Sequence, residues 1–260
     1  MSRVVMALSG GMDSTALLLH MLVRSNRVTC ISYDYGQKHI VELQRASANI
    51  DYLHSEGYTV EHIVADLSSA MALFDSSLTD SETPVPEGHY EEEQMKQTVV
   101  PNRNAIFSSI LYGYALSVST KEDVDVSMTL GVHSGDHAIY PDCRPEFYAA
   151  LKHAFEIGNW GSERVTVDLP YVDGDKESIL RDAIISCDSL GLDFDTIFRN
   201  TNTSYSPDQL GRSSGRTGAD VERILAFHAI GRKDPIEYVD DWGIVLERAL
   251  DTERRYEATL

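Results

Sequence analysis

The stretch VVMALSGGMDS, residues 4–14, decides the fold of this 260-residue chain. Residues 4–8 form a short, continuous apolar run, which is typical of a strand buried on both faces. A helical pattern begins near Met12 and continues to about Arg24. Between them, Gly10 and Gly11 allow a tight turn with positive φ and a close approach of a ligand to the main chain. Because amides at a helix N-terminus favour anions, the stretch predicts a phosphate-binding turn.

Strand and helix patterns alternate along the rest of the chain. Further strands are expected at residues 28–33, 60–64, 124–130 and 165–169. Helices are expected at residues 37–55, 105–118, 145–157, 176–190, 219–230 and 242–254. The β-α-β order predicts an α/β fold, with a Rossmann-like parallel sheet, right-handed crossovers and flanking helices.

The chain divides by composition into a large and a small part. Residues 1–200 are expected to form the Rossmann-like domain, and residues 201–260 a C-terminal loop with helices. Within the first part, the polar residues 66–98 interrupt the alternation and are expected to form an excursion or lid, partly helical. After Asp195, a composition rich in Ser, Thr, Gly and Asn predicts a loop through Gly218.

The charge and cysteine content limit the class of protein. There are 41 acidic and 22 basic residues, a net charge of −19, which disfavours extended binding to nucleic acid. The three cysteines are far apart in the sequence and indicate a reducing compartment without a disulfide framework. The first apolar run is too short for a signal peptide, and no run is long enough to span a membrane. The sequence therefore predicts a cytoplasmic protein.

The turn at residues 9–14 carries the groups expected to bind a nucleotide. Ser9 and Ser14 offer hydroxyls, Gly10 and Gly11 expose amides, and Asp13 could hold Mg²⁺ against phosphate oxygens. A tight structural turn would also need glycines, and no Walker A lysine follows. The six-residue string resembles the pyrophosphate loop of the ATP-pyrophosphatase superfamily, whose members adenylate a substrate and release pyrophosphate. Two residues at the ends of other predicted strands are assigned to the same nucleotide site, Tyr33 and Gly131.

Cationic side chains follow at the same edge of the predicted sheet. Lys38 and His39 come shortly after the second strand, and Arg103 lies in the first turn of a helix, where the helix dipole disfavours a cation. These groups could neutralise charge that builds up during adenylation. The alternatives are an ordinary helix start for the first pair and a solvated arginine for Arg103.

Residues 131–144 contain two carboxylates, an arginine and a thiol. The carboxylates of Asp136 and Asp142 could accept ring N–H groups of a purine-like base, and Arg144 could meet a substrate carboxylate. Cys143 is interpreted as inert rather than nucleophilic, because no paired base is evident.

With these motifs in order, the sequence resembles the 7-cyano-7-deazaguanine synthase (QueC) family from the first turn to Pro235. Lys176 lies where such enzymes carry a lysine after the fifth strand. The resemblance implies a Rossmann-like enzyme, often dimeric, that binds ATP and 7-carboxy-7-deazaguanine. It implies that the carboxylate is adenylated, that ammonia displaces AMP to give an amide, and that the amide is activated again and dehydrated to a nitrile.

The sequence departs from the family at a zinc site. Members carry four cysteines just before the helix that matches residues 219–230 of this chain. The matching positions here are Ser204, Ser214, Thr217 and Asp220. Such residues do not make a structural zinc site, so no zinc is expected. The loop must then hold itself by hydrogen bonds or order on meeting a partner. Asn102 also replaces a glycine of the family.

The loss of these ligands leaves the group that attacks the adenylate open. The main hypothesis is an ATP- and Mg²⁺-dependent ligase that joins 7-carboxy-7-deazaguanine to an amine as an amide. The amine could be the N-terminus of a partner protein, as in the QueC-like proteins of anti-phage CBASS operons. The alternatives are the standard nitrile synthase that uses ammonia and a non-catalytic nucleotide-binding module.

Overall fold

The computed structural model of this chain describes residues 3–25, 27–37, 41–78, 85–89, 91–133, 135, 139–205 and 207–259. Its centre is a sheet of five parallel strands in the order β3-β2-β1-β4-β5. The strands are β1 (Arg3–Ala7), β2 (Val28–Asp34), β3 (Val60–Asp66), β4 (Val126–Thr129) and β5 (Val165–Asp168). Because all five are parallel, their carboxyl ends meet at one edge, where open α/β sheets bind ligands.

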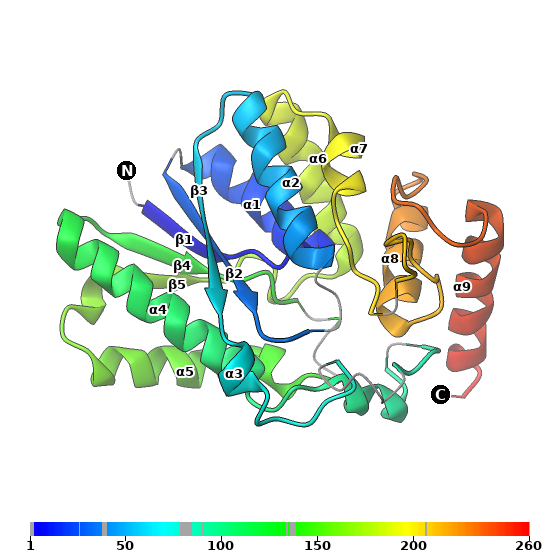
Figure 1. The fold of residues 1–260 in the computed structure, drawn as a ribbon, viewed down its shortest axis with the longest axis horizontal. Helices are drawn as coiled ribbons and strands as arrows, with labels where there is room; N and C mark the ends of the chain where they lie inside the picture. The colour runs from blue at the N-terminus through cyan, green and yellow to red at the C-terminus, as the bar shows by residue number, and fades with distance from the viewer. Residues whose placement is uncertain are drawn as a thin grey trace.

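Helices cover both faces of the sheet (Figure 1). One layer contains α1 (Met12–Arg24), α2 (Val41–Ser55), α6 (Lys176–Leu190) and α7 (Phe194–Arg199). The other layer contains α4 (Arg103–Glu122) and α5 (Pro145–Gly158). Side chains of β1 alternate between the layers, since Val4 and Met6 join the core under α1 while Val5 joins the core under α4.

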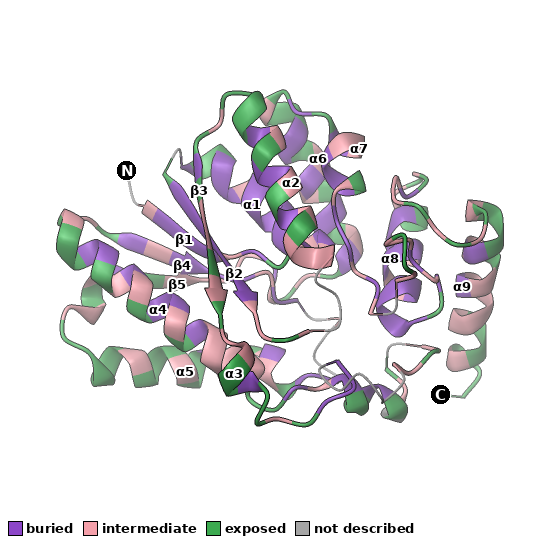
Figure 2. Ribbon diagram, in the orientation of Figure 1, coloured by how far each residue is buried: buried purple, intermediate pink, exposed green. Residues whose placement is uncertain are grey.

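The amino-terminal β-turn-α unit forms part of the best-buried region (Figure 2). Most residues of α1 are buried, and its side chains pack against α6 as well as the sheet. The turn that connects β1 to α1 is therefore held between two well-packed elements.

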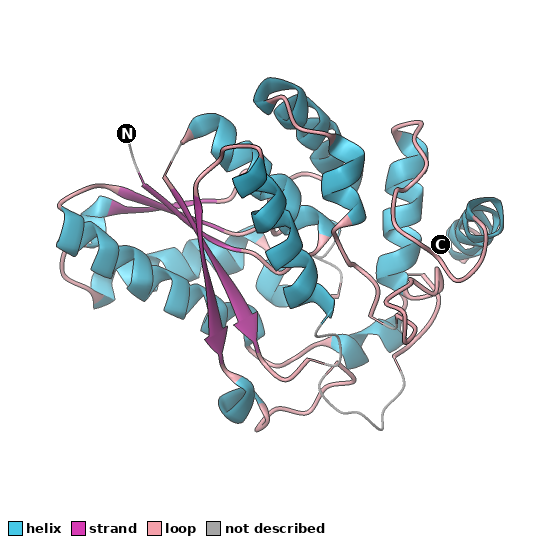
Figure 3. Cartoon of the chain, turned by 45° about the horizontal axis from the view of Figure 1, so that its top comes forward, coloured by secondary structure: helices cyan, strands magenta, loops and turns pink. Residues whose placement is uncertain are grey.

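The carboxyl-terminal part packs beside this α/β unit. Figures 1 and 3 show α8 (Gly218–Ala229) and α9 (Trp242–Glu257) lying side by side. They share a small apolar cluster, and Phe227 of α8 also joins the core under α1 and α6. Arg223 and Asp234 form a fully buried ion pair with an Nε–Oδ2 distance of 2.6 Å.

The described part of residues 66–98 is partly helical, as expected, whereas its role as an excursion or lid stays a prediction. It contains α3 (Ser68–Met71) and the 3₁₀ helix η1 (Glu93–Thr98). Met71 and Leu78 form a buried cluster with Val100, which directly precedes Pro101. Two further 3₁₀ helices are η3 (Pro141–Cys143) and η4 (Ser162–Arg164).

The predicted fold class is confirmed, and most predicted elements lie within a few residues of the observed ones. The prediction of a loop after Asp195 is wrong for its first residues, because α7 covers residues 194–199. The side chain of Asp193 accepts a hydrogen bond from Thr196 N at 2.7 Å, and Phe198 is fully buried, so a cap and an apolar face stabilise this short helix. The helix expected at residues 37–55 begins at Val41 in the described chain, since residues 38–40 lie outside it.

The division into two domains and the homodimer stay predictions. In the part of the chain that the structure describes, no helix combines the length and apolar character needed to cross a bilayer.

Candidate active site

The turn between β1 and α1 is fixed by its own hydroxyls and by the neighbouring helix. The Oγ atoms of Ser9 and Ser14 lie 2.9 Å apart, and Gly11 N donates to Ser9 Oγ at 3.1 Å. Gly10 has a φ of +88°, and a Cβ at this position would lie 2.1 Å from the carbonyl oxygen of Glu42. Only glycine fits this position, so the close packing of the turn against α2 accounts for the residue type.

The same turn presents groups that suit a phosphate. The amides of Asp13 and Ser14 lie in the first turn of α1, where amides have no partner within the helix and the helix dipole attracts anions. Gly131, after β4, packs so close that a Cβ would lie 3.2 Å from Ser14 N. The predicted nucleotide-binding residues at these strand ends are therefore brought together, and they fit a pyrophosphate group.

A buried lysine joins this turn to two other helices. Lys176 Nζ lies 3.0 Å from Asp13 Oδ2, 3.1 Å from Glu222 Oε2 and 3.0 Å from His133 Nε2. The lysine side chain is only 6% exposed. His133 and Glu222 were not assigned to the site from the sequence, since nothing local to either residue indicates that α6, α8 and the loop after β4 converge.

Asp13 retains one oxygen for a further partner. Its Oδ1 atom is buried and makes no hydrogen bond among the described residues. Mg²⁺ usually binds one or two carboxylates together with phosphates and water, so this oxygen fits the predicted role. The described residues contain no group of three or more His, Cys, Asp or Glu side chains arranged around a metal.

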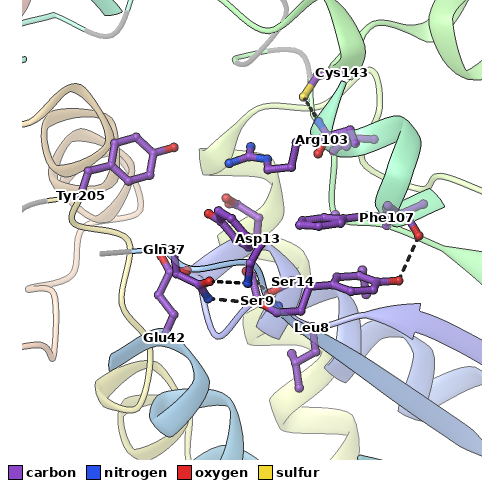
Figure 4. A pocket seen from close by; sticks show the side chains of 17 residues that line it. Leu8, Ser9, Asp13, Ser14, Gln37, Glu42, Arg103, Phe107, Cys143 and Tyr205 are labelled. Atoms are coloured by element: carbon purple, nitrogen blue, oxygen red, sulfur yellow. Dashed lines mark hydrogen bonds between the residues drawn. The ribbon is translucent and has the colours of Figure 1, made fainter. Parts of the chain in front are cut away.

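A pocket opens directly from the turn, as Figure 4 shows. Its walls come from the ends of β1 and β2, the start of α2 and α4, the segment after β4 and the loop at Tyr205. The rings of Tyr33 and Phe107 are stacked with their centroids 4.2 Å apart, and Tyr33 Oη donates to the carbonyl of Phe107 at 3.0 Å. The pocket can therefore accept a planar ring beside a bound phosphate.

Arg103 brings a permanent positive charge into this pocket. Its guanidinium carbon lies 5.9 Å from the ring centroid of Tyr35 and 5.8 Å from that of Tyr140, within the range of cation–π contacts. Arg103 begins α4 directly after Asn102, whose φ of 59° lies in the left-handed region that asparagine tolerates. This explains how asparagine can stand where the resembling family has glycine.

Glu42 is a pocket residue that the sequence did not reveal. It lies in the first turn of α2, where an acid is common at any helix start. Burial raises the pKa of its carboxyl to about 8, although the charge of Arg103 opposes the shift. Glu42 lines the pocket because the starts of α2 and α4 face the same space.

Two predicted site residues, Asp142 and Arg144, do not line the pocket. Asp142 Oδ2 accepts a hydrogen bond from Asn104 N at 3.2 Å, so this carboxylate caps the start of α4, and Arg144 precedes α5. Neither is among the described residues that line the pocket, whereas Cys143 is, with its sulfur 3.3 Å from Asn104 Nδ2. Lys38, His39 and Asp136 lie outside the described residues, so their roles stay predictions.

The four positions matched to zinc cysteines do come together, around a carboxylate. Asp220 Oδ2 accepts hydrogen bonds from Ser204 Oγ at 3.2 Å and from Ser214 Oγ at 3.0 Å. Ser213 Oγ donates to Oδ1, and Thr217 caps α8 by accepting from Asp220 N at 3.3 Å. The loop thus holds itself by hydrogen bonds, one of the two outcomes expected for it.

This loop also contacts the turn between β1 and α1. Asn202 N donates to the carbonyl of Gly10 at 2.9 Å, and Tyr205 lines the pocket. The cluster around Asp220 therefore supports one wall of the site.

Known proteins resemble this chain in sequence over most of its length. Residues 3–231 match the family described as "Queuosine biosynthesis protein QueC". A 7-cyano-7-deazaguanine synthase of Alteromonas mediterranea is 42% identical over 236 residues, which cover 91% of this chain and 98% of that protein. The enzyme of the same name from Caldicellulosiruptor saccharolyticus is also 42% identical, over 91% of this chain and 95% of its own.

Among solved structures, NMN synthetase from Francisella tularensis aligns with 98% of this chain and 84% of its own, at a TM-score of 0.39 and 15% identity. The match to the QueC model and the 42% identity to curated synthases cover nearly all of this chain. The chain therefore belongs to the QueC family and is a homologue of 7-cyano-7-deazaguanine synthases.

Proposed function

We propose that this protein is a 7-cyano-7-deazaguanine synthase, which uses ATP to convert a 7-carboxy-7-deazapurine into the nitrile. The observation that carries the proposal is the continuity of the phosphate-binding turn with a pocket that holds Arg103 and stacked aromatic rings. That arrangement lets a carboxylate on a planar base lie next to the α-phosphate of ATP. The names of the relatives supply the substrate class.

Two rounds of activation follow from this chemistry. The substrate carboxylate attacks the α-phosphorus, pyrophosphate leaves, and ammonia then displaces AMP from the acyl adenylate to give an amide and a proton. In the second round the amide oxygen attacks a new ATP, and a second pyrophosphate leaves. Loss of AMP and a proton from the adenylated imidate leaves the nitrile.

The residues of the turn would stabilise the leaving pyrophosphate. The first amides of α1 and the hydroxyl of Ser14 donate hydrogen bonds to phosphate oxygens, and Arg103 neutralises the charge that develops beside the carboxylate. Asp13 would hold Mg²⁺ through its free oxygen, and that ion supplies further neutralisation of phosphate charge. We assign Lys38 and His39 to the same phosphates on their sequence positions alone.

The relatives favour ammonia as the nucleophile over an amine of a partner protein. The protein-acceptor hypothesis arose from the four missing cysteines. Since Asp220 and three serine hydroxyls close the loop with hydrogen bonds, the replaced cysteines do not require a different acceptor. Transfer to a partner's N-terminus stays a prediction.

Carboxylate-dependent release of pyrophosphate tests the proposed activation step. Ser14→Ala, which removes one hydroxyl from the turn, should lower kcat/KM by about 10- to 100-fold. Ser109→Ala is the matched control, because Ser109 is exposed on α4 and, within the described chain, its hydroxyl donates only to the carbonyl of Ala105 in its own helix. Release that is independent of the carboxylate, or an equal loss in both variants, would count against the proposal.

A further inference from the structure

Glu42 enters the pocket from a rigid position. Its main chain packs against Gly10 so closely that any side chain there would clash with the Glu42 carbonyl. Figure 4 shows Glu42 and Arg103 reaching the pocket from different sides, the first from α2 and the second from α4. A ligand in the pocket therefore meets the Glu42 carboxylate and the Arg103 guanidinium at separate points.

Within the described chain, the Glu42 carboxylate has no hydrogen-bond or ion-pair partner, in contrast to Gln37 and Asp13 of the same pocket. Gln37 accepts from Tyr35 N at 2.8 Å and donates to the carbonyl of Tyr33 at 3.2 Å, so both ends of its amide are used. Asp13 is paired with Lys176. Among the described residues, Glu42 makes no side-chain hydrogen bond or ion pair. A half-buried acid of this kind is costly unless a ligand satisfies it.

The unmatched carboxylate and the aromatic walls fit one edge of a guanine-like base. The N1–H and 2-amino groups of such a base are adjacent donors, and a carboxylate offers two acceptor oxygens at matching spacing. The ring would lie along the Tyr33 and Phe107 side chains, while the negative group at position 7 turns toward Arg103. The two ends of the substrate thus meet groups of complementary character.

We propose that Glu42 is a specificity-determining residue that selects the 2-amino-6-oxo edge of the deazapurine, an inference that rests on the proposed function. Adenine presents an acceptor at N1 and does not match an ionised carboxylate. In its ionised form, Glu42 therefore separates the substrate base from the base of ATP, although both reach one continuous pocket.

Calorimetric binding of two ligands tests this role without turnover. The ligands are 7-carboxy-7-deazaguanine and its analogue without the 2-amino group. The wild-type protein should prefer the first by about 10- to 100-fold, since hydrogen bonds to a charged group give differences of this size. Glu42→Gln has nearly the same shape but offers a donor in place of one acceptor. It should reduce the preference to about threefold or less and leave the affinity for ATP within about twofold.

Two further variants complete the experiment. Glu56→Gln is the matched control, since Glu56 is exposed just beyond the other end of α2, and it should behave as wild type. Glu42→Asp keeps the carboxylate and should retain part of the preference, even if Glu42→Gln folds poorly. A preserved preference in Glu42→Gln, or a selective loss of ATP affinity, would overturn the inference. Absence of nitrile formation by a wild-type protein that still prefers the 2-amino ligand would overturn only the proposed function.

Discussion

Lys176 Nζ lies 3.0 Å from Asp13 Oδ2, although the two residues are 163 positions apart in the sequence. The contact joins the first turn of α6 to the first turn of α1, and Glu222 ties α8 to the same ammonium group. The buried ammonium group of Lys176 thus holds the turn between β1 and α1 in place. This arrangement links the stability of the fold to the position of the first amides of α1, which we propose bind phosphate.

Loss of the lysine should be costly to the fold. Lys176→Met leaves two largely buried carboxylates without their cation, and we expect the free energy of unfolding to fall by about 3 kcal/mol. Lys152→Met is the control, because the Lys152 side chain is 47% exposed and its Nζ atom lies 3.9 Å from Glu156 Oε1. This variant should lose less than about 1 kcal/mol in the free energy of unfolding. Urea denaturation of both variants measures the difference, and equal losses would show that the buried cluster has no special role.

The ion pair of Arg223 and Asp234 should be the strongest single polar contribution to the C-terminal part. Asp234→Ala leaves the guanidinium fully buried and unpaired, which predicts a loss of about 3–5 kcal/mol in the free energy of unfolding. The comparable change nearer the surface is Asp195→Ala, which removes a half-exposed carboxylate whose Oδ1 atom lies 2.8 Å from an Arg232 Nη atom. Thermal unfolding in parallel should show a much smaller shift for the surface variant. A similar shift would contradict the assignment.

The hydrogen bonds around Asp220 should take the place of a metal in this chain. Asp220→Ala removes the acceptor of three serine hydroxyls and of the main-chain amides of Arg216 and Thr217, and with hydrogen bonds of about 1 kcal/mol each it should cost about 5 kcal/mol. Asp241→Ala is a suitable control, because Asp241 precedes α9 without a side-chain capping bond. A zinc chelator should leave the Tm of the wild-type protein unchanged. A drop in Tm on chelation, with zinc found in the purified protein, would refute this prediction.

Substrate affinity should depend on pH through Glu42. Burial raises the pKa of this carboxyl to about 8 in the free protein, against the opposing effect of Arg103. Donor groups of the base favour the ionised form, so binding below pH 8 must release a proton. The affinity should rise on the order of tenfold per pH unit up to about pH 8 and then level off. Calorimetry between pH 6 and 9 should show this slope in the wild type and a flat profile in Glu42→Gln.

Much of the fold could be predicted from the sequence because its strands are continuous apolar runs followed by periodic helices. α1 was predicted with the same ends, since a glycine turn precedes Met12 and a polar segment follows Arg24. The short α7 was not, because only six residues show its pattern and its stability comes from burial of Phe198 against other helices. Tertiary packing, rather than local preference, decides such an element.

The candidate site was predictable where its residues belong to a motif or to a position matched by the family resemblance, and not where a residue outside both joins the site through packing. The grouping of Ser204 with Asp220 followed from the register of the family resemblance, whereas Ser213 was missed because the resemblance assigns no ligand there. Glu42 was missed since a first-turn acid satisfies the helix dipole without any ligand. Long-range contacts carry information that a single sequence does not display locally.

The product formed from labelled ammonium tests the central claim most directly. The protein is mixed with 7-carboxy-7-deazaguanine, ATP, Mg²⁺ and isotopically labelled ammonium, and the base is identified by mass spectrometry. We predict the nitrile with a single labelled nitrogen. Two molecules of AMP and two of pyrophosphate should accompany each nitrile, because each of the two activations uses one ATP. Recovery of the carboxylate unchanged, or accumulation of the labelled amide alone despite excess ATP, would contradict the proposed synthase activity.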